Sequence, residues 1–158
     1  MEAEDKYIIT QDIIGPSTEI GLDVERFLQL RSAKETLSSA FSIEEKYELL
    51  IRNFVELESD VLVNTVQDML TSKQEYSEFF DVRLKINQRM VNLLTSCRLY
   101  VDHIKQHAKA CTEDDPSTNS KINSLFSTEY DAHFEYRFFE ALRNYVQHRG
   151  LAVHNVYH

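Results

Sequence analysis

The scarcity of chain-breaking residues constrains this sequence more than any other feature. Its 158 residues include only 3 Gly and 2 Pro. Glycine and proline interrupt helices and strands, so a chain with so few of them favours long, uninterrupted helices over a loop-built or low-complexity protein. A hydrophobic fraction of 42% supplies a core and excludes general disorder. The sequence therefore predicts an all-α fold.

The length predicts a single domain over residues 1–158, because a chain of this size can bury roughly two-thirds of the surface that its unfolded form exposes. No apolar run approaches the roughly 18 residues that a membrane span needs. The segment Met1–Asp5 is acidic where a secretory signal would be basic. Cys97 and Cys111 cannot make a disulfide framework. We expect a cytoplasmic protein with no membrane partner.

The negative charge is concentrated in the first part of the chain. Residues 1–60 hold 6 Lys and Arg against 14 Asp and Glu, whereas residues 130–158 hold 3 against 3 and contain four of the six histidines. An overall charge of −9 argues against a general nucleic-acid coat protein, which would present a basic face. It leaves room for a local site that handles one phosphate.

The first 70 residues predict a short arm and then helices. Residues 1–15 read as an extended arm that contains the β-branched run Tyr7–Thr10, and the core is expected over about residues 22–150. One or two modest helices are predicted between Pro16 and Ala40. Ser42 then begins a capping box, which predicts the start of a long helix that continues to Met69.

The remaining chain predicts two more long helices. A second capping box lies at residues 72–75, and an apolar stripe at helical spacing runs from Phe80 to Ala108. Thr112–Asn119 is predicted to be a loop and Ser124–Phe126 a short helical turn. The last helix is expected over about residues 127–149, with Gly150 as its stop. Long helices joined by short connections pack most simply as an up-down bundle.

One pair of histidines has the spacing of metal ligands. His103 and His107 lie four residues apart on one helix face, and Cys111 follows one turn later. Nothing nearby completes the usual ligand set. Two solvated histidines on an exposed face are the favoured interpretation, so we expect no metal and no cofactor.

The last helix carries the most distinctive group of polar residues. Arg143, Asn144 and His148 lie near the C-terminal end of an otherwise hydrophobic helix. Asn144 and His148 share a face, whereas Arg143 lies about 140° from His148 around the axis and about 7.5 Å from it along the axis. One straight helix does not bring Arg143 and His148 together. A bent arginine side chain or a symmetry-related copy could complete the site.

This arrangement resembles the R-x4–6-H motif of the HEPN superfamily, including its preference for a small polar residue directly after the arginine. The motif lies where that family has it, near the end of the last long helix of a helical bundle. The segment from Phe41 to Glu58 is similar to the first long helix of an uncharacterised bacterial branch, and the resemblance covers roughly residues 30–155.

The resemblance implies a homodimer whose two motifs line a shared cleft and cleave RNA without a metal. His148 would accept the proton of a ribose 2′-hydroxyl, and Arg143 would hold the phosphate. Asn144 would orient the histidine or the phosphate by hydrogen bonding. Arg137, His133 and Arg149 could extend the phosphate-binding surface or be ordinary solvated residues. The family includes toxins and phage-defence effectors, so an antitoxin or another neighbouring-gene protein is a possible partner.

Two alternatives remain open beside the endoribonuclease. A non-catalytic HEPN-like domain would bind a nucleotide, RNA or a protein, and a structural module would serve only helical dimerisation. In the structural module, Arg143 would pair with Glu135 or Glu140, and His148 would cap the C-terminal end of the helix. The motif also departs from the His-x-Tyr continuation of many HEPN toxins, because Arg149 and Gly150 follow His148. The conformation of the chain after Gly150 is not predicted.

Overall fold

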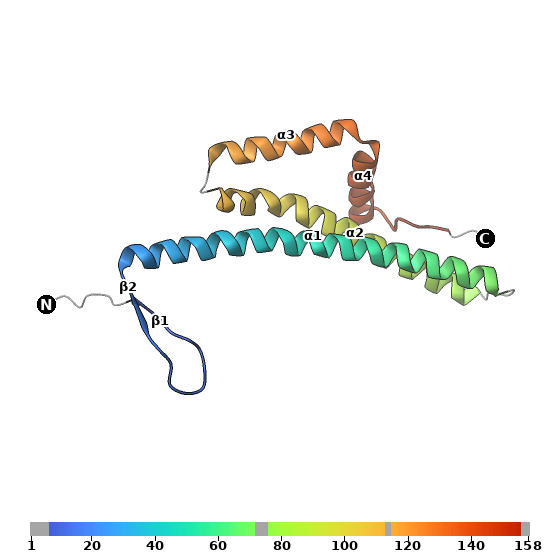
Figure 1. Ribbon diagram of the computed structural model, residues 1–158. Coiled ribbons are helices and arrows are strands. Elements are labelled where there is room, and N and C mark those ends of the chain that lie inside the picture. Colours follow the sequence, from blue (N-terminus) through green and yellow to red (C-terminus); the bar gives the residue numbers. More distant parts are fainter. Residues whose placement is uncertain (1–6, 72–75, 113–114, 156–158) are drawn as a thin grey trace.

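The computed structural model describes residues 7–71, 76–112 and 115–155, and the following account concerns those residues. The expected all-α helical bundle is confirmed, with strand confined to one small hairpin (Figure 1). The elements in chain order are β1 (Tyr7–Ile9), β2 (Ile20–Leu22), α1 (Val24–Leu70), α2 (Tyr76–Cys111), α3 (Pro116–Ala132) and α4 (Phe134–His148).

A long antiparallel pair of helices, α1 and α2, forms the body of the molecule (Figure 1). Helix α3 turns back along α2, and the short α4 crosses from the far end of α3 to α2. The buried apolar side chains of the described chain are few and belong to α1 and α2: Leu57, Leu93 and Leu94. None of the helices in the described chain combines the length and apolarity that crossing a membrane requires.

Helix α1 begins earlier than the sequence pattern predicted. The carboxylate of Asp23 accepts a hydrogen bond from the Arg26 amide at 2.7 Å, which caps the helix start. The predicted start at Ser42 was wrong, because Ser42 lies inside a continuous helix and its carbonyl accepts a bond from Lys46 Nζ at 3.1 Å. Contacts with α2 continue on both sides of Ser42, through Thr36 and Lys46, so the local capping pattern does not act. The second predicted capping box, at 72–75, lies outside the described residues.

The predicted loop Thr112–Asn119 was wrong in its second half, because α3 already begins at Pro116. Proline suits the first helical position, where its missing N–H costs nothing. Asp115 is the N-cap, and its side chain accepts from the Ser117 amide at 2.9 Å. The predicted short turn at Ser124–Phe126 is part of the same helix.

The predicted last helix over residues 127–149 is in fact broken at His133, which adopts an extended conformation between α3 and α4. Arg137 explains the break. Its Nη1 donates to the carbonyl oxygens of Tyr130 at 2.8 Å and Asp131 at 2.7 Å. In a continuous helix these carbonyls would accept the amides of residues 134 and 135. The guanidinium replaces those amides and closes the end of α3.

The N-terminal arm is a β-hairpin. Its strands pair antiparallel, with Tyr7 opposite Leu22 and Ile9 opposite Ile20, so the helix predicted from residue 16 was wrong at its start. Tyr7 stacks on Phe27 of α1 with ring centroids 4.1 Å apart. The rest of the hairpin projects away from the helices (Figure 1).

A charged cluster joins α1 to α2 in the half of the pair that α3 and α4 leave uncovered. The Asp60 carboxylate lies 2.6 Å from Lys85 Nζ and 2.7 Å from Arg89 Nε, and Arg89 also pairs with Glu56. The hydrogen bonds from Lys85 and then Arg89 lower the pKa of Asp60 below its ordinary value. The stability that these contacts provide is therefore fully present above the ordinary aspartate pKa. It is lost as the pH falls through the lowered pKa of Asp60.

The segment after α4 is anchored to α2 by Asn87 and Arg83. The amide of Asn87, which is 1% exposed, donates to the carbonyl of Val153 at 2.8 Å and accepts from its N–H at 2.8 Å. Arg83 adds a bond from Nη1 to the carbonyl of His154 at 3.2 Å. Asn87 thus pairs with Val153 as a neighbouring strand would, and fixes the direction in which the chain leaves α4.

We predict that Asn87→Ala lowers the free energy of unfolding by about 1–3 kcal/mol, because it leaves both backbone groups of Val153 without their partner. Urea unfolding measures the loss, and hydrogen exchange should show a deprotected Val153 amide. Asn92→Ala, which removes an exposed asparagine of the same helix, is the control. Equal effects of the two substitutions would contradict the assigned role.

Candidate functional site

Helix α4 has two different faces, and this difference governs the candidate site. Its inner face packs toward α2 through half-buried side chains that include Phe139, Leu142 and Val146. Its outer face leaves Phe134, which is 65% exposed, and Phe138, which is 49% exposed, in solvent. The motif residues are divided between these faces.

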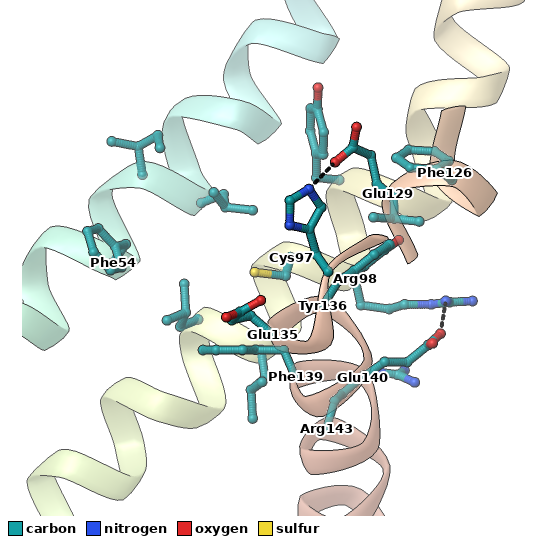
Figure 2. A pocket seen from close by; sticks show the side chains of 17 residues that line it. Phe54, Cys97, Arg98, Phe126, Glu129, Glu135, Tyr136, Phe139, Glu140 and Arg143 are labelled. Atoms are coloured by element: carbon teal, nitrogen blue, oxygen red, sulfur yellow. Dashed lines mark ion pairs between the residues drawn. The ribbon is translucent and has the colours of Figure 1, made fainter. Parts of the chain in front are cut away.

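A hollow of about 540 Å³ lies beside the inner face of α4 (Figure 2). Its walls are mostly apolar and come from all four helices, for example from Leu50, Phe54, Leu94, Phe126 and Phe139. Helices α3 and α4 contact α2 and each other more extensively than they contact α1, which leaves this space between them and α1. The hollow therefore results from the crossing of α4 rather than from a missing side chain.

Charged groups gather where the hollow meets α4. Arg98 of α2 lies 3.6 Å from the Glu140 carboxylate, and His133 lies 3.2 Å from Glu129 (Figure 2). The surrounding wall is apolar enough that burial raises the pKa of the Cys97 thiol, which makes this thiol a weak nucleophile at neutral pH.

Arg143 lines the hollow and is half-buried. Its Nη1 donates to Asn144 Oδ1 at 3.3 Å. The pairing with Glu135 or Glu140 that the sequence also allowed is not made within the described chain, where Glu140 pairs instead with Arg98. Arg143 thus keeps a guanidinium that no carboxylate neutralises, held next to the side chain of Asn144.

His148 is the last residue of α4 and is exposed. It does not line the hollow. Five helical positions separate it from Arg143, which places the two side chains about 140° apart around the axis. The structure thus brings Arg143 and Asn144 together, but within one chain it does not bring His148 to Arg143.

The three residues expected to extend a phosphate site have different places. Arg137 uses its Nη1 to close the end of α3, and His133 lies in the extended break between α3 and α4. These two residues shape the corner that positions α4. Arg149 is the exposed C-cap of α4, one residue beyond His148.

Sequence reasoning missed the contacts that fix the end of α4. The hydroxyl of Tyr145 lies 3.2 Å from Nε2 of His154, and a Cβ at Gly150 would come within 3.2 Å of that hydroxyl. The absence of a side chain at Gly150, which follows the Arg149 cap, therefore leaves space for the Tyr145 hydroxyl. The sequence did carry one signal that the segment after α4 is fixed. Asn87 is a polar residue inside the apolar stripe of α2, and a buried asparagine needs hydrogen-bond partners.

The histidine pair on α2 does not form a metal site in the described part of the chain, where no three potential ligands come together. The rings of His103 and His107 lie 6.3 Å apart, and His107 Nε2 is 3.3 Å from Lys46 Nζ. Cys111 Sγ contacts the carbonyl of Thr36 at 3.7 Å. Burial, followed by the charges of Lys46 and His103, lowers the pKa of His107 below the ordinary histidine value.

We predict that Lys46→Met raises the pKa of His107, because it removes a positive charge 3.3 Å from the ring. An NMR titration of the imidazole signals measures the shift, with Lys46→Arg as the variant that keeps the charge. Because the folded pKa is lowered, the unfolded chain binds more protons around the ordinary histidine pKa, and stability should fall as the pH drops through that range. An unchanged pKa in Lys46→Met would refute the assignment.

Comparisons with protein-family models, curated proteins and solved structures found no match to this chain. The resemblance to the HEPN superfamily therefore rests on the sequence, chiefly on the motif that α4 carries.

Proposed function

We propose that this protein is a metal-independent endoribonuclease of the HEPN type that acts as a homodimer, in the manner of a toxin or a phage-defence effector. The observation that carries the proposal is the state of Arg143. Its guanidinium has no carboxylate partner in the described chain, lies against Asn144, and comes five helical positions before an exposed histidine at the helix end. A guanidinium that no carboxylate neutralises is available to bind a phosphate group.

The three side chains supply the groups that RNA cleavage by the 2′-hydroxyl needs. A neutral His148 would take the proton from the 2′-oxygen, which then attacks the adjacent phosphorus and expels the 5′-oxygen of the next nucleotide. Arg143 would neutralise the charge that develops on the phosphate oxygens. Asn144 would orient the guanidinium through the contact that it already makes. The products are a 2′,3′-cyclic phosphate and a 5′-hydroxyl.

The outer face of α4 supports a shared site. Phe134 stacks on Phe138 at 6.1 Å, and both are largely exposed, as is Tyr145 one turn before His148. A contiguous exposed apolar face of this kind is typical of an interaction surface. A second copy on this face would cover these rings and place its own motif beside that of the first chain. For Arg143 of one copy to work with His148 of the other, the Arg143 side chain has to reach around α4 from the hollow that it lines.

The hollow favours a second candidate function. An apolar cavity of about 540 Å³ with a few charged groups at its edge has the size and character of a ligand site. In this alternative the protein is a non-catalytic HEPN-like domain that binds an apolar molecule or peptide, and Arg143 anchors a negative group of that ligand. The formal charge of −9 suits this alternative better than extended RNA binding, whereas catalysis at one phosphate needs only a local site.

We predict that the purified protein cleaves total RNA in EDTA and leaves 2′,3′-cyclic phosphate ends. Arg143→Ala and His148→Ala should each reduce cleavage by about 10²-fold or more, because each removes a group that acts in the transition state. His103→Ala and Arg31→Ala, which remove exposed residues of the same types on other helices, are the matched controls. Cutting that survives His148→Ala would contradict the proposed site, and an inactive dimer would favour the binding domain.

A mixing experiment tests whether the site is shared between chains. Co-expressed Arg143→Ala and His148→Ala chains should recover about a quarter of wild-type cleavage, because half of randomly paired dimers are mixed and one of their two sites is intact. A site contained within one chain would recover none. Differently tagged chains and a pull-down establish that mixed dimers form.

A further inference from the structure

The face of α1 that points away from α2 carries its own apolar repeat. We call it the outer seam. Its residues recur at steps of three or four, with a mean close to the 3.5 of a paired helix. The outer seam consists of Leu30, Ala33, Leu37, Phe41, Glu44, Glu48, Arg52, Val55, Ser59, Leu62, Val66 and Met69.

The outer seam is uncovered in the described chain. Helix α1 contacts α2 through the side that holds Leu57 and Asp60, and the seam lies about 180° around the axis from that side. Its apolar residues are accordingly open to solvent, including Leu37 at 70%, Leu62 at 63% and Met69 at 82% exposed. A helix that is apolar on two opposite faces is expected to be buried on both.

The exposed area is far larger than that of a compact chain. The protein exposes 12486 Å², whereas a compact chain of 18.5 kDa would expose about 8,200 Å². A stable interface needs only about 600–1,000 Å² from each partner. One chain therefore has enough uncovered surface for more than one stable contact, and the outer seam runs along α1 within that surface.

The residues of the outer seam are self-complementary when two copies run antiparallel. The seam has an apolar block at each end and the charges Glu44, Glu48 and Arg52 between the blocks. Its midpoint lies between residues 49 and 50. In an antiparallel pair centred there, Leu30 lies opposite Met69 and Leu37 opposite Leu62.

The charged centre selects the same arrangement. Glu48 and Arg52 already pair within the helix at 2.8 Å. Across the antiparallel two-fold axis, Glu48 of each copy lies within one position of Arg52 of the other, so these four charges form a neutral network, while Glu44 lies opposite Val55. A parallel pair would instead set Glu44 and Glu48 against the same residues of the second copy, which like-charge repulsion disfavours.

We propose that a second copy of this chain packs antiparallel on the outer seam about a two-fold axis near residues 49 and 50. This contact uses α1 alone and is separate from the outer face of α4, so it does not depend on the proposed nuclease. A chain with two separate self-complementary faces assembles into a tetramer when both are occupied.

Thiol cross-linking tests the register directly. Leu37→Cys and Leu62→Cys chains of different tag size are treated with a short bifunctional maleimide, singly and as a mixture, beside the wild type, which shows any linkage through Cys97 and Cys111. We expect strong linkage between the two different chains in the mixture and little linkage of either variant to itself. Linkage of each variant to itself would show a parallel pair and overturn the proposal, as would the absence of linkage in the mixture.

The mass in solution tests the same contact independently. Leu62→Glu should halve the mass of the wild-type assembly in light scattering, whereas Leu49→Glu, which changes an exposed leucine of α1 outside the seam, should not. Circular dichroism establishes that both variants remain helical. A wild-type monomer, or a mass that Leu62→Glu leaves unchanged, would overturn the proposal. Because neither readout uses RNA, an inactive protein would refute the proposed nuclease without affecting this result.

Discussion

The pairing of α1 with α2 is the constraint on which the rest of the structure depends. Helix α1 has 47 residues and would span about 70 Å, but α2 covers only one of its faces and α3 and α4 cover little of the remainder. A single chain consequently buries very few apolar side chains, and Leu57, Leu93 and Leu94 mark the centre of that small core. The arrangement of helices is thus fixed within one chain, while much of its apolar surface stays exposed.

The parts of the fold that the sequence predicted well are those where periodic burial decides the structure. The stripe from Phe80 to Ala108 corresponds to α2, since one continuous face of it packs on α1. Errors arose where a local signal competed with packing. The capping pattern at Ser42 is overridden inside α1, and Pro116 begins α3 although it was taken for part of a loop. The break at His133 depends on a side chain four residues later, Arg137, which no periodicity reveals.

The candidate site was predictable in composition but not in geometry. The sequence supplied Arg143, Asn144 and His148 and their helical spacing, from which the separation of Arg143 and His148 on one helix follows. It could not show that α4 is a short helix of its own, that Arg143 faces a hollow, or that Glu140 is occupied by Arg98. These properties arise because α4 crosses α2 at the angle that the α3–α4 corner sets, and that angle is a tertiary property.

The position of the motif at the end of α4 has a structural cost that points to assembly. His148, Phe138 and Tyr145 are exposed and therefore contribute little to the stability of a single chain. The C-terminal segment is also neutral, in contrast to the acidic residues 1–60. The segment after α4 is nevertheless fixed by Asn87 and by the contact between Tyr145 and His154, so the helix end is held in one orientation. A surface that is apolar, rigid and carries unpaired polar groups is preorganised for a partner, because binding to it costs little ordering entropy. The same rigidity would let two copies place Arg143 and His148 reproducibly across a shared axis.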